Sequence, residues 1–417
     1  MAPPLTPASS IREEPMSEAP IPSPSSSYSK DDTLRIGIDL GTSRTRVFYQ
    51  HVHGHYTQIT APIKPVKLKK NQDAAAYQIM ILMPDSVIYG WNDVNEAILN
   101  DPSLQDQAIR RMKLALHEEF ENIPDVVHTR KVLNAGKDRG ALQDSFEMFL
   151  LAVIEDTKGF LKRQISGVGE PGSYWDNITL EFQISVPAMW NDAQRGIVRN
   201  AAQMAAKASS MSAKSLKIEL REEALCVATP YMYEMGSTEV GSLLITVDDG
   251  DGTLDIATTE LLRAHSNTGP MQLRRIGLCS GNGAGAHMVN AEAAKWLLQY
   301  PNIQGICGKL HISERELLRQ FNDAIDYIKE KRIGKRLKGR EGSIETVTIE
   351  SSHGKTGHGY LNEKQFQIPV ELIMSWYKVW IDTAAKLLKS HLANLPAGRR
   401  TRAVLTGVSC LRFVFRT

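Results

Sequence analysis

Residues 242–261, SLLITVDDGDGTLDIATTEL, constrain the fold more than any other stretch of this chain. The apolar and β-branched residues at 243–247 and 256–259 predict two strands, and the Asp- and Gly-rich turn between them predicts a hairpin. Bare glycine backbone lets N–H groups come close to a phosphate, and carboxylates beside such a turn can hold a hydrated cation. By itself, the stretch predicts either an ordinary surface hairpin or a phosphate-binding hairpin.

A second hairpin of the same kind is predicted near the start of the chain. In residues 34–49, LRIGIDLGTSRTRVFY, alternating apolar residues predict a strand, and a second strand follows a Gly-Thr-Ser turn. Asp39 at the end of the first strand and the hydroxyls of the turn are the groups that Mg²⁺ and phosphates use. Two such hairpins in one chain favour a phosphate site over two unrelated turns.

Length and composition narrow the class of protein. A chain of 417 residues exceeds the usual size of a single core, which favours two lobes. The 49 basic and 47 acidic side chains nearly cancel, so charge indicates neither a nucleic-acid nor a membrane partner. No apolar run reaches the roughly 18 residues that span a membrane. The cysteines form no C-x-x-C pair, which argues against zinc and against a disulfide framework and fits a reducing compartment.

The first part of the chain, residues 1–32, is rich in Pro and Ser and predicts a disordered tail. Glu13, Glu14 and Glu18 argue against a mitochondrial presequence, and the tail lacks the apolar segment of a secretory signal. We therefore expect a cytoplasmic protein, with nuclear access left open.

A longer and more specific pattern occupies residues 184–205, ISVPAMWNDAQRGIVRNAAQMA. Alternating apolar residues predict a strand that Pro187 ends, and an apolar face after it predicts a helix. This run resembles the strand, turn and helix of 70-kDa heat-shock chaperones, and the two hairpins resemble the two phosphate loops of the actin-like ATPase superfamily. The resemblance covers about residues 34–407 and is nearest to the divergent fungal-type branch, without a peptide-binding domain.

The resemblance implies an α/β fold, namely a two-lobed actin-like (ribonuclease-H-like) ATPase domain with ATP or ADP and Mg²⁺ in a cleft between the lobes. The first lobe is expected over residues 33–240, with an insert at about 61–140. The second lobe is expected over residues 241–417, with a helical subdomain at about 281–368. Protein clients or co-chaperones are the partners that such a protein implies.

The resemblance also implies roles for single residues. Lys113 would reach the γ-phosphate and Glu223 would orient a water, with Asp248 and Thr253 completing the catalytic set. Mg²⁺ would be held, mostly through its waters, by Asp39, Asp248 and Asp255. The residues expected to contact phosphates or adenosine are Gly41, Thr42, Ser43, Gly250, Gly252, Thr253, Gly281, Gly283, Lys331, Arg332 and Gly407.

Simpler interpretations stay open for several of these residues. Lys113 lies in a run where Ile109, Met112, Leu116 and Phe120 could share one helix face, so it could be a solvated residue on the opposite face. The glycine turn at 281–285 could be an ordinary helix entry, and the basic stretch at 329–340 an ordinary solvated helix end.

Asp251 departs from the family pattern, which has the middle of three glycines there. A carboxylate about 4 Å from a phosphate oxygen costs up to roughly 4 kcal/mol at an effective dielectric of about 20. We therefore expect weak or absent ATP hydrolysis, unless the side chain of Asp251 points away from the phosphates. The alternatives are a non-hydrolysing nucleotide-binding or interaction protein and a sugar kinase of the same superfamily.

The match to the family pattern stops at Gly407. We therefore expect a C-terminally truncated second lobe with an unpaired sheet edge, and a gene-model artefact as its favoured cause. The alternative is that residues 411–417, LRFVFRT, form a substitute strand that closes this edge.

Overall fold

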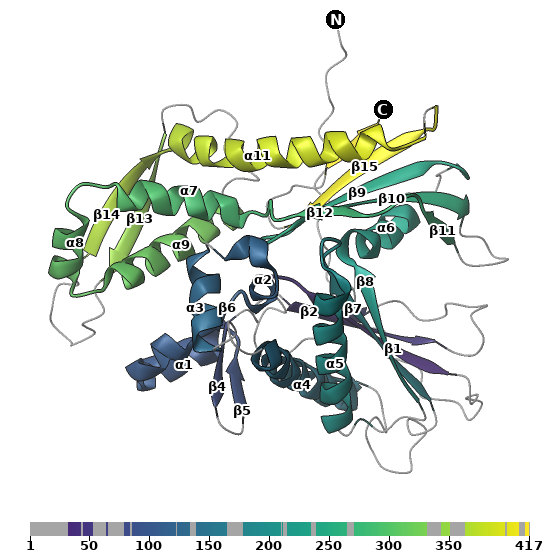
Figure 1. Ribbon diagram of the computed structural model, residues 1–417, viewed down its shortest axis with the longest axis horizontal. Coiled ribbons are helices and arrows are strands. Elements are labelled where there is room, and N and C mark those ends of the chain that lie inside the picture. The colour runs from purple at the N-terminus through teal and green to yellow at the C-terminus, as the bar shows by residue number, and fades with distance from the viewer. Residues whose placement is uncertain are drawn as a thin grey trace, which may run out of the picture.

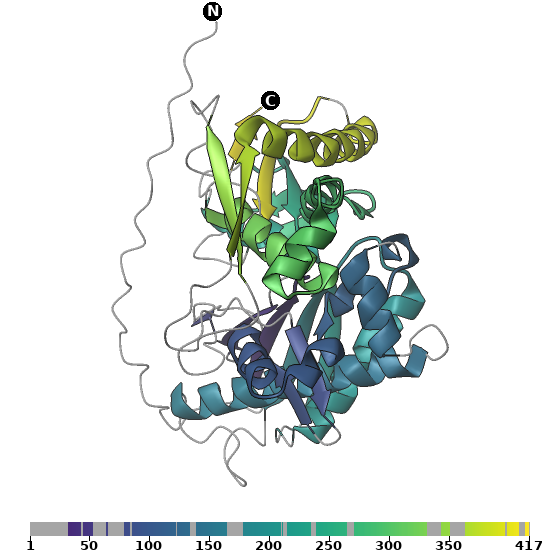
Figure 2. The same ribbon diagram turned by 90° about the vertical axis from the view of Figure 1, so that its left-hand side faces the viewer.

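The protein has a mixed α/β structure with several sheets (Figure 1). The computed structural model describes residues 32–42, 45–52, 64–65, 79–83, 86–121, 123–133, 139–164, 178–209, 211, 215–234, 239–264, 271–331, 343–350, 363–396, 398–407 and 413–416. Two large sheets each have an apolar core of their own. The sheet formed by the N-terminal part of the chain lies below the other one in Figures 1 and 2.

The first sheet has the strand order β3-β2-β1-β7-β8. Its strands are β1 (Thr33–Leu40), β2 (Thr45–Val52), β3 (Lys64–Pro65), β7 (Thr179–Val186) and β8 (Ser215–Glu222). The predicted hairpin of β1 and β2 is confirmed, and β7 runs parallel to β1. Every second residue of β1 is buried, because alternate side chains of a strand point to opposite faces.

Two helices cover this sheet, α4 (Arg139–Gln164) and α5 (Asp192–Ala208). A third helix, α6 (Glu223–Glu234), follows β8 and packs its Ala228 against Leu244 and Leu261 of the second large sheet. α4 and α5 bury their apolar residues in the core of the sheet. α5 begins where the sequence predicts a helix after Pro187. Asn191 and Gln194 form a capping box there, in which each side chain accepts a hydrogen bond from the backbone N–H of the other residue.

The insert forms a small three-stranded sheet and short helices. Its elements are β4 (Ile79–Met83), β5 (Ser86–Tyr89), α1 (Trp91–Asn100), η1 (Pro102–Gln107), β6 (Ile109–Arg110), α2 (Met112–Ala115), η2 (Glu118–Phe120) and α3 (Pro124–Val132). The idea that residues 109–120 share one helix face is wrong, because Arg111 adopts a left-handed conformation (φ 52°) between β6 and α2. Lys113 is consequently buried rather than solvated.

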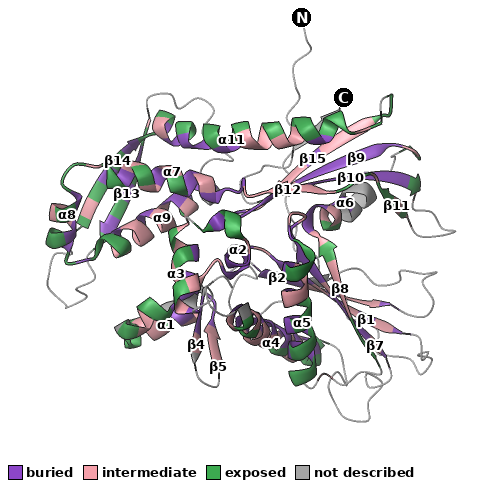
Figure 3. Cartoon of the chain, in the orientation of Figure 1, coloured by how far each residue is buried: buried purple, intermediate pink, exposed green. Residues whose placement is uncertain are grey.

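The second large sheet contains β9 (Leu243–Asp249), β10 (Leu254–Arg263), β11 (Gln272–Arg275), β12 (Ser280–Asn282), β15 (Thr401–Gly407) and β16 (Phe413–Arg416). β9 and β10 form the predicted second hairpin and are buried along most of their length (Figure 3). β15 runs parallel to β9 and pairs on its other side with β16. The expectation of an unpaired edge at β15 is therefore wrong, since the last described residues form the substitute strand.

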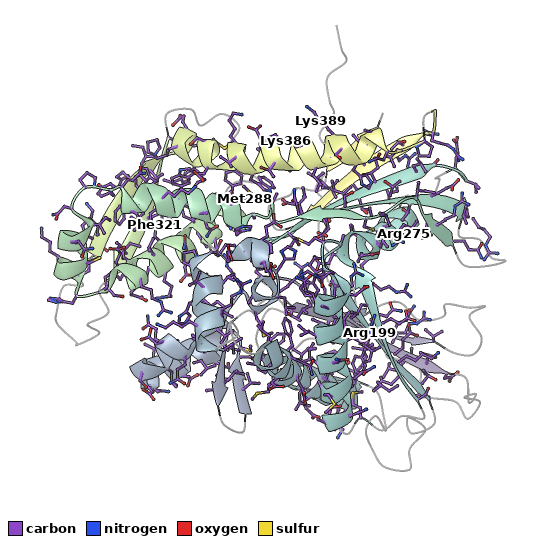
Figure 4. All side chains as sticks on the ribbon, in the orientation of Figure 1. Arg199, Arg275, Met288, Phe321, Lys386 and Lys389 are labelled. Carbon is purple, nitrogen blue, oxygen red and sulfur yellow. The ribbon has the colours of Figure 1, made fainter. Side chains whose placement is uncertain are left out.

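The helical part comprises α7 (His287–Leu298), α8 (Ile303–Leu310), α9 (Glu314–Lys331) and α11 (Val370–Ala393), with the two-stranded sheet of β13 (Ile344–Glu350) and β14 (Glu363–Pro369). Phe321 lies inside it among aromatic rings, whereas Lys386 and Lys389 project from α11 on the outside (Figure 4). Within the described ranges, no helix has the length and apolarity that crossing a membrane requires.

Candidate functional site

The turns of the two hairpins meet at one point in the fold. A Cβ placed on Gly252 would lie 2.4 Å from Oγ1 of Thr42 and 2.4 Å from Cδ2 of Leu114. Any larger side chain at Gly252 would collide with both residues, so glycine is required by the close approach. The first sheet, the second sheet and the insert thus come together at the two predicted phosphate loops.

Three predicted metal carboxylates come from strands beside these turns. Asp39 ends β1, where its Oδ1 accepts a hydrogen bond of 2.8 Å from Oγ of Ser185. Asp248 and Asp255 are directly opposed partners in the β9–β10 hairpin. Oδ1 of Asp248 accepts a bond of 3.2 Å from Oγ1 of Thr406.

Asp255 is fully buried, and one of its oxygens lacks a partner. Its Oδ1 accepts a hydrogen bond of 2.6 Å from the backbone N–H of Ala188, in the turn after β7. Its Oδ2 is buried with no hydrogen-bond partner among the residues that the structure describes. A buried carboxylate oxygen without a donor is costly, so this atom fits contact with a cation or a water.

Lys113 and Glu223 form a buried ion pair between α2 and the start of α6. Burial by itself lowers the pKa of Lys113, but the charge of Glu223 and its hydrogen bond outweigh burial and raise it. The structure therefore brings together the two residues that the resemblance assigns to the γ-phosphate and to the attacking water. Here the ammonium group contacts Glu223.

Carboxyl groups outnumber cations in this cluster, where Asp255 and Glu223 are buried and Asp39 and Asp248 are half-buried beside Lys113. Burial and the charges of Asp39 and Asp255 together raise the pKa of Asp248 to about 7. Burial also raises the pKa of Glu223 to about 8, against the opposing charge of Lys113. Added positive charge would relieve this crowding of carboxyl groups.

The predicted contacts with Mg²⁺ run mostly through its waters. Among the described residues, no group of three or more His, Cys, Asp or Glu side chains is placed to hold a metal ion. Mg²⁺ that keeps its waters needs carboxylates spaced more widely than direct ligands. The donor set of Asp39, Asp248 and Asp255 fits the prediction of a hydrated ion.

The space beside Lys113 is small. A cavity of about 20 Å³ lies there, enough for about one water molecule. Its lining includes no residue of the second hairpin, so this cavity is not the space between the two turns. The cavity is lined by Leu40, Gly41, Met80, Met112, Lys113, Phe146 and Phe149.

The carboxylate of Asp251 points inward, toward two cations. Its buried carboxylate lies 3.5 Å from Nη1 of Arg111 and 3.4 Å from Nζ of Lys329. Burial acts to raise the pKa of Asp251, but the charges of Arg111 and Lys329 outweigh burial and lower it to about 2. The expectation that this side chain points outward is therefore wrong, and its closeness to a bound phosphate stays a prediction.

Sequence reasoning missed Arg111 and Lys329. Lys329 follows Ile325 by one helical turn on α9, so it lies on the same face as the buried Ile325 and Ile328. This spacing could have marked it as a buried lysine. For Arg111 the sequence holds no comparable signal, because its place depends on the left-handed backbone at the start of α2.

The glycine turn before α7 packs against the site. A Cβ on Gly281 would lie 2.6 Å from Oδ1 of Asp255, and one on Gly283 would lie 2.8 Å from a ring carbon of Phe120. A Cβ on Gly285 would lie 2.4 Å from the carbonyl oxygen of Asp251. The first N–H groups at α7, of Ala286 and His287, donate to the carbonyls of Gly250 and Asp251 at 3.0 and 2.8 Å. These donors thus bind the second hairpin itself.

The other predicted residues fall into two groups. Gly250 closes the second turn by donating its N–H to the carbonyl of Thr253 at 2.9 Å, and Thr253 is buried. Gly407 ends β15 with φ 125°, where a Cβ would lie 1.8 Å from the carbonyl oxygen of Asp249. The predictions for Ser43, Arg332 and the side chain of Lys331 fall outside the described residues.

No protein-family model matches this chain, and no curated protein matches it either. The resemblance described above therefore depends on the two hairpins and on the run at 184–205.

Proposed function

We propose that this chain binds ATP or ADP together with Mg²⁺ between its two hairpins, as a two-lobed, actin-like protein of the heat-shock-chaperone type. One observation supports this proposal above the others. Four carboxyl groups, two of them buried and two half-buried, lie where the hairpins meet, beside one buried lysine, Lys113. The four acids are Asp39, Asp248, Asp255 and Glu223. A hydrated divalent cation would balance them, and a nucleotide's phosphates are the usual companion of such a cation.

Several side chains would have defined tasks at a bound nucleotide. The cation would supply charge neutralisation during phosphoryl transfer. Lys113 would exchange Glu223 for a phosphate oxygen, and the released carboxylate of Glu223 would orient a water. Hydrolysis would be slow, because Lys113 must first leave a buried partner and because Thr42 must separate from Gly252.

Calorimetry tests the proposal. MgATP and MgADP should bind to the wild type, binding should disappear when EDTA removes Mg²⁺, and Asp248→Asn should weaken it by at least about tenfold. Asp382→Asn is the matched control. This aspartate is exposed on the outside of α11, and among the described residues its partner is Lys378. Equal binding by Asp248→Asn and wild type would contradict the proposed cation site.

A second candidate is an interaction protein that keeps the fold without binding a nucleotide. The direct approach of Thr42 to Gly252 and the buried pairing of Lys113 favour it. Absence of binding heat at millimolar MgATP, in a protein that unfolds cooperatively, would support this candidate over the first. We further propose protein clients or co-chaperones as partners and the cytoplasm, with access to the nucleus, as the location.

A further inference from the structure

Two buried cations from separate parts of the chain converge on the carboxylate of Asp251. Arg111 comes from the insert and Lys329 from α9, with the distances to Asp251 given above. The side chain of Lys329 is 1% exposed and that of Asp251 is 4% exposed. A buried carboxylate that faces two cations acts as their internal counter-ion.

Other contacts hold both cations in place independently of Asp251. Nζ of Lys329 donates to Oδ1 of Asn290 at 2.6 Å and to the carbonyl of Ala286 at 3.3 Å, and it lies 2.6 Å from Oδ1 of Asp326. Arg111 also pairs with Asp125 at 3.4 Å. Removing the Asp251 carboxylate should therefore leave the two cations close to their present positions.

A third positive element borders the same place. α7 begins beside Asp251, because the backbone N–H of His287 donates to the carbonyl oxygen of Asp251. The first N–H groups of α7 already donate to backbone carbonyls, so α7 contributes the partial positive charge of its dipole rather than hydrogen bonds.

We propose that Arg111, Lys329 and the start of α7 form an oxyanion site that the chain fills with its own Asp251 carboxylate. The external ligand that suits it is a phosphate group, either free or on a nucleotide, because the site offers a guanidinium fork and an ammonium group. The site goes beyond the proposed function and does not depend on Mg²⁺. Its occupation by Asp251 excludes external phosphate from the wild-type chain.

Asp251→Gly tests this assignment, because it removes a group comparable in size to inorganic phosphate. Thermal unfolding is measured with EDTA in sodium phosphate and in sodium chloride at equal ionic strength. In chloride, the melting temperature of the variant should lie below that of wild type. Phosphate should raise the melting temperature of the variant in a saturable way, by at least about 3 °C more than it raises the melting temperature of wild type. If the variant does not fold in chloride, the refolding yield in phosphate against chloride is the readout.

Two further variants separate an oxyanion site from a purely structural ion cluster. Arg111→Gln combined with Asp251→Gly should lose the phosphate effect, and Asp251→Asn should show none, because the amide still fills the space. Repeating the titration with ADP in EDTA distinguishes a nucleotide's phosphate from the free ion, and a response to either one supports the site. The oxyanion site would be overturned if phosphate and chloride had equal effects on the melting and refolding of Asp251→Gly. It would also be overturned if the phosphate effect were undiminished in the double variant.

Discussion

The buried pair of Lys113 and Glu223 should respond asymmetrically to the loss of each partner. Lys113→Met removes an ammonium group that is 4% exposed and leaves Glu223 beside the charges of Asp39, Asp248 and Asp255. Removing one member of a buried pair typically costs about 3–5 kcal/mol when an uncompensated charge remains, so the comparison is made at about pH 9, above the pKa of about 8 that Glu223 has beside Lys113. We expect a loss in this range in the free energy of unfolding of Lys113→Met.

Glu223→Gln should lower the free energy of unfolding less than Lys113→Met does. The lysine keeps the attraction of Asp255 and Asp39, whose charges also raise its pKa, and the crowding of carboxyl groups decreases. We expect a loss of about 1–2 kcal/mol, the usual cost of a disturbed buried hydrogen bond. The double variant should be more stable than Lys113→Met alone, because the glutamine amide that replaces the Glu223 carboxylate carries no charge.

Urea unfolding of the three variants at one pH measures these differences, provided that the slope with urea concentration stays constant. Lys378→Met is a matched control, because its pair with Asp382 is exposed, and we expect a change within about 0.5 kcal/mol. The electrostatic reasoning is refuted if Lys113→Met is no less stable than Glu223→Gln.

Two further predictions concern residues around the site. Gly252→Ala should lower the free energy of unfolding by about 1–3 kcal/mol, because its methyl group would overlap Leu114. Gly196→Ala on α5 has free space and should be neutral or stabilising in the same urea assay. Similar losses of stability in both variants would contradict the close approach at Gly252. Burial lowers the pKa of His287 to about 4, so between pH 6.5 and 4 the unfolded chain binds more protons than the folded chain and stability falls as pH falls. His287→Asn should remove about 3 kcal/mol of this pH dependence, and parallel stability profiles of variant and wild type would contradict the assignment.

The sequence by itself determined the local structure around the site. Alternating apolar residues and Gly-rich turns predicted both hairpins, and the strand before Pro187 with the helix after it was predicted from the same kind of pattern. These features depend on neighbours along the chain, so their patterns are visible in the residues themselves. The sequence placed Asp248 in the turn, whereas the structure extends β9 to Asp249 and pairs Asp248 with Asp255.

Only the tertiary structure decided which charges meet. Lys113 and Glu223 lie 110 positions apart, and Lys329 and Asp251 lie 78 apart, so no local pattern links them. The burial of Lys113 and the inward turn of Asp251 depend on the backbone at Arg111 and on the packing of α7 and α9 against the second hairpin. The pairing of β16 with β15 likewise depends on which strand edge the fold leaves open. The physical reason is common to all of these contacts: each follows from how separate elements pack, which the residues of one element do not specify.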